Sequence, residues 1–110
     1  MTEDDKDRLL LELVRELRTV HAEVCLLRVQ RERHAQQLRG VCRRLDSVSC
    51  PLRVVDGRLV DAEGADVVFP ECSDVVRVLG RLRDFESRLA TVRSQLAALG
   101  VPLTAPDPGA

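Results

Sequence analysis

The sequence predicts a mainly α-helical fold, in which two long antiparallel coiled-coil helices are joined by a short β-hairpin connector. Two long segments repeat apolar residues with heptad spacing, and the segment between them contains Asp-Gly, a dipeptide typical of tight hairpin turns. We expect four parts along the chain: a coiled-coil helix with an N-terminal overhang over residues 1–47, a connector over 48–70 with a hairpin at 52–61, a second coiled-coil helix over 71–100, and a flexible tail over 101–110.

The first helix is predicted by a heptad that starts at Leu10. Alternating steps of three and four residues from Leu10 to Val48 meet apolar residues at ten of twelve positions, which is a strong coiled-coil signal. Thr2 is a suitable N-cap, because its hydroxyl can accept from a free amide and three acidic residues follow it in the first turn. The segment contains no proline that would interrupt the helix.

Arg31 and His34 occupy the two polar positions of this seam. One interpretation is a hydrated layer that sets the register of the coiled coil, because a charge inside a seam is unfavourable unless it reaches water or a carboxylate. The alternative is that Arg31 belongs to a basic surface for an acidic partner. That surface would consist of Arg28, Arg31, Arg33, Arg39, Arg43 and Arg44, with Glu32 as the one acid among them.

The second helix shows an uninterrupted heptad from Val75 to Leu99, in which all eight seam positions are apolar. Pro70 and Ser73 are suitable start signals. Gly100 is a suitable C-cap, and Pro102 prevents continuation of the helix beyond it.

The connector carries the signature of a β-hairpin. Apolar and β-branched residues flank Asp56-Gly57, which tolerates the positive φ angles of a type I′ turn; the expected hairpin residues are Val54, Val55, Asp56, Gly57, Leu59 and Val60. A structured loop is the alternative. Since a lone two-stranded hairpin is marginal in water and leaves its edges unpaired, we expect it to pair with another subunit or to lie on the helices.

The expected geometry leaves the N-terminal third of the first helix without a partner. If the hairpin folds the chain directly back, Val48 lies near Val75 and Leu99 lies opposite Val24. The overhang would then bind another protein or another copy, because its apolar surface is too dense to stay in water. A parallel homodimer of the first helix would use the same residues, so a homo- or hetero-oligomer follows in either case. The expected interface is Leu9, Leu10, Leu13, Val14, Leu17 and Val20.

The order of a helix, one β-hairpin and an antiparallel helix resembles a β-type subunit of prefoldin, an oligomeric chaperone. The segment Cys50-Pro-Leu-Arg-Val-Val-Asp-Gly-Arg-Leu-Val-Asp61 is similar to the hairpin of that family, and the helix after it begins near a proline. The resemblance implies that the hairpin joins a β platform between subunits, and that helix tips hold unfolded clients. The second helix is short for that client-binding role.

Composition favours a non-catalytic protein that binds other proteins. The chain has no glycine-rich phosphate loop, no nucleophile elbow and no cluster of metal ligands, so we expect neither an enzyme nor a cofactor. Nucleic acid is disfavoured as a partner, since the net charge is −1 and no aromatic residues interleave the arginines. The four cysteines match no common zinc spacing, and we expect reduced thiols. An acidic N-terminus and the lack of a long apolar run predict a soluble, intracellular protein, cytoplasmic or nuclear, that is not inserted in a membrane.

Overall fold

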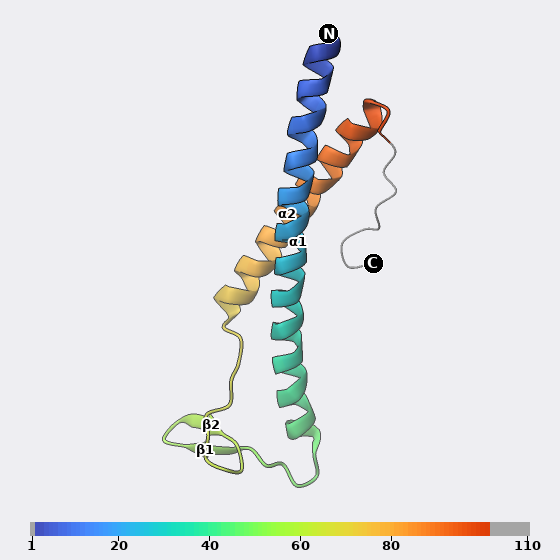
Figure 1. The fold of residues 1–110 in the computed structure, drawn as a ribbon. Helices are drawn as coiled ribbons and strands as arrows, with labels where there is room; N and C mark the ends of the chain where they lie inside the picture. The colour runs from blue at the N-terminus through green and yellow to red at the C-terminus, as the bar shows by residue number, and fades with distance from the viewer. Residues whose placement is uncertain (1, 102–110) are drawn as a thin grey trace.

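The computed structural model describes residues 2–101 and confirms two antiparallel helices joined by a two-stranded hairpin. The chain forms α1 (Glu3–Asp46), β1 (Arg53–Val55), β2 (Arg58–Val60) and α2 (Cys72–Ala98) in that order (Figure 1). Most of the tail expected to be flexible, residues 102–110, lies outside the described residues. The molecule is a rod measuring 70 × 24 × 17 Å, with α2 crossing the N-terminal half of α1 and the hairpin lying near the other end of α1.

Helix α1 begins and ends as its sequence dictates. The Thr2 hydroxyl accepts a hydrogen bond from the Asp5 amide at 3.2 Å, and acidic residues occupy the first turn, where they interact favourably with the helix dipole. Arg43 and Arg44 lie in the last turn, where cations are favourable for the same reason. At Ser47 the backbone becomes extended and the helix ends.

The hairpin turns at Asp56-Gly57, as predicted. Both residues have positive φ angles, 52° and 74°, which identify the type I′ turn whose twist matches that of the two strands. Val54 is paired with Leu59, and Val55 with Arg58. Each strand has three residues, so the ladder is slightly shorter than the predicted 52–61.

A tight turn follows β2 and brings the chain back alongside it. The Asp61 carboxylate accepts hydrogen bonds from the amides of Glu63 at 2.9 Å and Ala65 at 3.0 Å, and Gly64 takes a positive φ of 85°. Asp66 then forms an isolated bridge with Val60, and the Val67 amide donates to the Leu59 carbonyl at 3.1 Å. The outer edge of β2 is therefore partly covered by the chain's own return segment.

Helix α2 ends in a Schellman motif at Gly100. The Gly100 amide donates to the Ala97 carbonyl and the Val101 amide to the Leu96 carbonyl, while Gly100 itself has a φ of 83°. Val101 packs against the apolar cluster that contains Leu96, which is the hydrophobic contact that often accompanies this motif. Gly100 therefore ends the helix as predicted, although the C-cap residue is Leu99 and Gly100 directly follows it. The N-cap is Glu71, which makes no side-chain capping bond, and Ser73 lies inside the helix.

Most of the core is an aliphatic seam between α1 and α2, and Val41 and Val60 are buried outside it. One cluster joins Val20, Val24 and Leu27 of α1 to Val78, Leu82 and Leu89 of α2, with Phe85 packed against it. A second cluster, nearer the N-terminus of α1, joins Leu13 to Val92 and Leu96. No buried polar or charged residue is present among the described residues, so burial of apolar surface holds the helices together.

Candidate functional site

The N-terminal leucines of α1 lie in the intramolecular core, and the prediction of an N-terminal overhang is wrong. Leu13 and Val20 are buried at 5% and 2% exposure against α2. The other four residues of the expected interface, Leu9, Leu10, Val14 and Leu17, are partly buried against the same clusters. This surface is therefore occupied by α2 rather than left for a partner.

The pairing of the helices is shifted relative to the expected one. Leu99 packs in the cluster that includes Leu10, not beside Val24, a difference of 14 positions or roughly 21 Å along a helix. The connector is the first reason. After the hairpin, the chain runs back alongside α1 without forming a helix, so α2 begins only near the middle of α1 (Figure 1). The second reason is chemical: the shift places most of the apolar seam of α2 on the apolar part of α1, and Arg31 and His34 lie beside its first turns, where they line a groove with Val75 and Val78.

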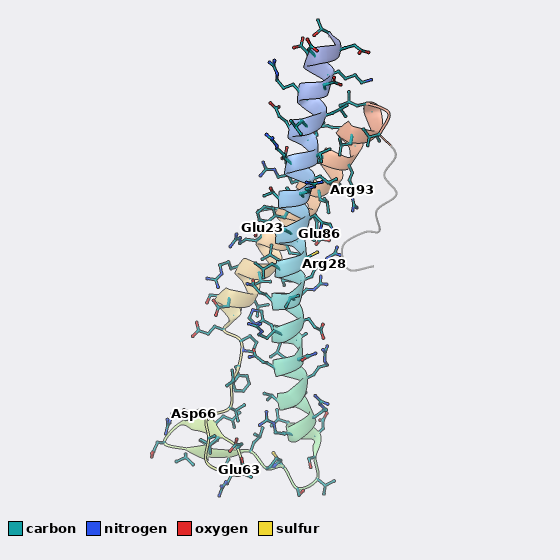
Figure 2. All side chains as sticks on the ribbon, viewed as in Figure 1. Glu23, Arg28, Glu63, Asp66, Glu86 and Arg93 are labelled. Carbon is teal, nitrogen blue, oxygen red and sulfur yellow. The ribbon has the colours of Figure 1, made fainter. Side chains whose placement is uncertain are left out.

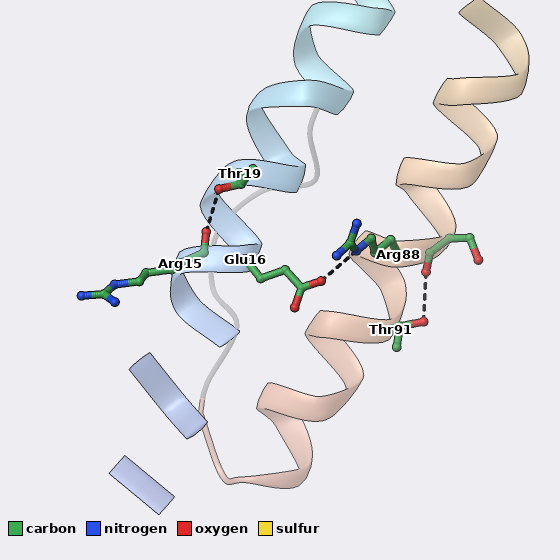
Figure 3. A network of polar contacts seen from close by, with 6 residues as sticks. Arg15, Glu16, Thr19, Arg88 and Thr91 are labelled. Atoms are coloured by element: carbon green, nitrogen blue, oxygen red, sulfur yellow. Dashed lines mark hydrogen bonds and ion pairs between the residues drawn. The ribbon is translucent and has the colours of Figure 1, made fainter. Parts of the chain in front are cut away.

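Ion pairs between described residues join the helices in this register. Glu16 accepts from the Arg88 guanidinium at 2.8 Å, beside the helical hydrogen bonds of Thr19 and Thr91 (Figure 3). Arg28 donates to Glu86 at 2.9 Å, and Figure 2 shows this pair where the helices cross. Both pairs therefore stabilise the contact between α1 and α2 within one chain.

Beyond the start of α2, α1 presents an apolar face that α2 does not cover. Leu38 and Leu45 continue the heptad of the core but are 44% and 58% exposed, although Val41 between them is buried at 4%. Leu79 of α2 is 47% exposed, and it lines a groove of about 140 Å³ together with Arg31, His34, Ala35, Leu38, Val75 and Val78. We call the surface formed by Leu38, Leu45, Val75 and Leu79 the distal face.

Sequence reasoning missed the distal face because it depends on where α2 begins. The heptad that starts at Leu10 does include Leu38 and Leu45 as seam positions. The expected pairing of Val48 with Val75 would have covered both leucines with α2. His34 marks the boundary: it is half-buried, and its Nδ1 is buried without a hydrogen-bond partner in residues 2–101. Arg31 and His34 therefore lie where helix packing ends.

The predicted basic surface is only partly available. Arg28 is engaged by Glu86, Arg39 is paired with Glu32, and the Arg44 Nε donates to the Gly40 carbonyl at 3.3 Å. Arg31, Arg33 and Arg43 make no ion pair or hydrogen bond within residues 2–101. The free guanidinium groups therefore belong to the part of α1 that carries the distal face.

The hairpin residues lie at the opposite end of the rod from the α1 N-terminus, with one strand edge open (Figure 1). Val54 is 73% exposed and Val55 is 45% exposed, whereas Val60 is buried. Val54 and Leu59 form the non-hydrogen-bonded pair of the ladder, with one hydrogen-bonded pair on each side of it. The backbone amide and carbonyl of Val54 therefore point away from β2, toward the open edge of β1. Asp56 and Gly57 form the two central residues of the turn.

The described residues offer little for other chemistry. Within residues 2–101, no three His, Cys, Asp or Glu side chains are grouped so that they could hold a metal ion. Cys25, Cys42, Cys50 and Cys72 are free thiols. In the same part of the chain, neither helix has the length and apolar character needed to cross a bilayer.

Comparisons with known proteins give no match. No protein-family model, no curated protein and no solved structure is similar to this chain at the significance required.

Proposed function

We propose that this chain is a non-catalytic coiled-coil subunit that mediates protein–protein interaction and the assembly of an oligomeric complex. The observation that supports this most is the distal face. An α-helix that continues its heptad for several turns past its intramolecular partner exposes leucines that water solvates poorly, and another helix is the complementary occupant. The proposed interface with a partner is therefore the C-terminal part of α1, and not the N-terminal leucines that the sequence suggested.

The elongated shape supports the same class of function. A rod built from one helix pair has an aliphatic core and long solvated sides, and the groove beside Leu38 is a shallow feature between helices. Enzymes generally place several polar groups in a concave apolar pocket, an arrangement that this groove lacks. Helix-to-helix recognition uses the surfaces that such a rod has.

Light scattering and circular dichroism across a dilution series test this proposal. We expect the average mass to rise with concentration, or to rise on addition of a helical partner, and we expect Leu38→Asp with Leu45→Asp to reduce that rise. The matched control is Leu11→Asp with Leu26→Asp, which alters two leucines that are also about half exposed, at 51% and 53%, but lie away from the distal face. A chain that stays a helical monomer at every concentration and binds no helical probe of either charge would contradict the proposal.

A second candidate function is a prefoldin-like chaperone subunit that assembles through its hairpin. The specific observation in its favour is the open edge of β1, which can accept another strand. Val54→Lys with Leu59→Lys would then abolish assembly with helicity retained. Intact oligomers from this variant would argue against a β platform.

A further inference from the structure

The part of α1 that carries the distal face has a strongly one-sided charge. Residues 28–44 contain six arginines and one acid, Glu32, a formal net charge of +5 in a chain whose total is −1. Arg31 occupies a seam position and lines the groove, while Arg44 directly precedes Leu45, between three and four turns further along α1. The leucines of the distal face therefore lie beside guanidinium groups, and the one that lines the groove, Arg31, has no ion pair or hydrogen bond within residues 2–101.

We infer that the distal face binds an amphipathic helix of a different protein, with leucine-like residues on one face and carboxylates beside them. This inference rests on the proposed function and names its partner class. The apolar positions of the partner would cover Leu38, Leu45 and Leu79, which are about half exposed. Its carboxylates would meet Arg31 at the groove and Arg44 at the edge, since charges beside the seam select coiled-coil partners.

A second copy of this chain fits the distal face poorly. Two distal faces packed against each other would bring one +5 segment next to another, which costs free energy through like-charge repulsion. The acidic N-terminal part of α1 in a second copy has the right charge, but its leucines are already packed against α2. Nucleic acid would be attracted by the arginines, yet it offers nothing to cover the leucines.

The test uses the full chain and two synthetic helical peptides of about 21 residues, identical except at the edge positions. Both carry leucine at the seam positions; one has glutamate and the other lysine beside the seam. We expect the glutamate peptide to bind at least roughly tenfold more tightly by fluorescence anisotropy, with a preference that shrinks as salt is added. The edge charges have the same sign within each peptide, so like-charge repulsion disfavours self-association of both peptides.

Variants assign the binding to the distal face. Leu38→Asp with Leu45→Asp should remove binding of the glutamate peptide, whereas the control Leu11→Asp with Leu26→Asp should retain it. Arg31→Glu with Arg44→Glu should reverse the preference, so that the lysine peptide binds more tightly. Because these side chains are exposed or only half-buried, circular dichroism should show that each variant keeps its helices.

Several outcomes would overturn the inference while leaving the proposed function intact. These are equal binding of the two peptides, loss of binding in the control variant alone, or a homodimer that Leu38→Asp with Leu45→Asp converts to a monomer. The last result would make a second copy the occupant. Binding of neither peptide by a chain that still forms oligomers would place assembly on another surface.

Discussion

In α1, the segment from Leu9 to Leu27 and the segment from Ala35 to Asp46 carry the same heptad repeat, yet α2 covers only the first. Val24 is completely buried in the first segment; in the second, Val41 is buried, but Leu38 and Leu45 are 44% and 58% exposed. The helices differ in length, 44 residues in α1 and 27 in α2, so one of them must extend past the other. The contrast teaches that a heptad specifies an apolar face but does not specify what covers it.

The largest expected effect comes from a comparison of two leucine truncations. One removes Leu96 of α2, which packs against the first segment, and the other removes Leu45 of the second segment. Leu96→Ala should lower the free energy of unfolding by about 2–5 kcal/mol, because it leaves a cavity where the side chain is 1% exposed. Leu45→Ala should change it by about 0.5 kcal/mol or less, as expected for an exposed position. Urea unfolding followed by circular dichroism measures both. Equal losses would show that the distal face is covered in solution.

Glycine substitutions sharpen the comparison at smaller magnitude. Gly80→Ala, in α2, should stabilise the protein by about 0.4–1 kcal/mol, because a Cβ there meets nothing within 4 Å and alanine favours the helix. Gly40→Ala, in the uncovered part of α1, has similar room, since the nearest atom to its Cβ is the flexible end of Arg44 at 3.9 Å. We expect Gly40→Ala to stabilise only the helix around residues 35–46.

Hydrogen exchange separates the two glycine variants. In Gly80→Ala the slowest amides of both helices should exchange more slowly, because global unfolding is opposed. In Gly40→Ala only the amides near residues 35–46 should change, because this segment can open without breaking the core. A global effect of Gly40→Ala would mean that the whole of α1 unfolds as one unit.

The smallest expected effect concerns two ion pairs. Arg28 and Glu86, with side chains 20% and 40% exposed, should show a coupling energy of up to about 1 kcal/mol in a double-mutant cycle. Arg39 and Glu32, 58% and 57% exposed, should couple by about 0.3 kcal/mol, because water and salt screen them more. A larger coupling in the exposed pair would contradict the assignment of Arg28 to the helix interface.

Local features were predictable wherever a few neighbouring residues decide the structure. The Thr2 cap, the type I′ turn at Asp56-Gly57 and the helix end at Gly100 each depend on one backbone conformation or one hydrogen bond. The return of Asp66 and Val67 to β2 was not predicted. It depends on the turn that the Asp61 carboxylate stabilises, which lies just beyond the predicted hairpin at 52–61.

The sequence by itself determined the two heptads, the hairpin between them and the antiparallel order of the helices, because periodicity and turn chemistry act over short distances. Only the tertiary structure decided the register. The connector can end at several heights along α1, and the choice depends on which seam positions of the two helices fit together. The observed register placed α2 on Leu13, Val20 and Leu27, with Arg31 and His34 beside its first turns. That register buried the leucines expected to bind a partner and exposed Leu38 and Leu45 instead.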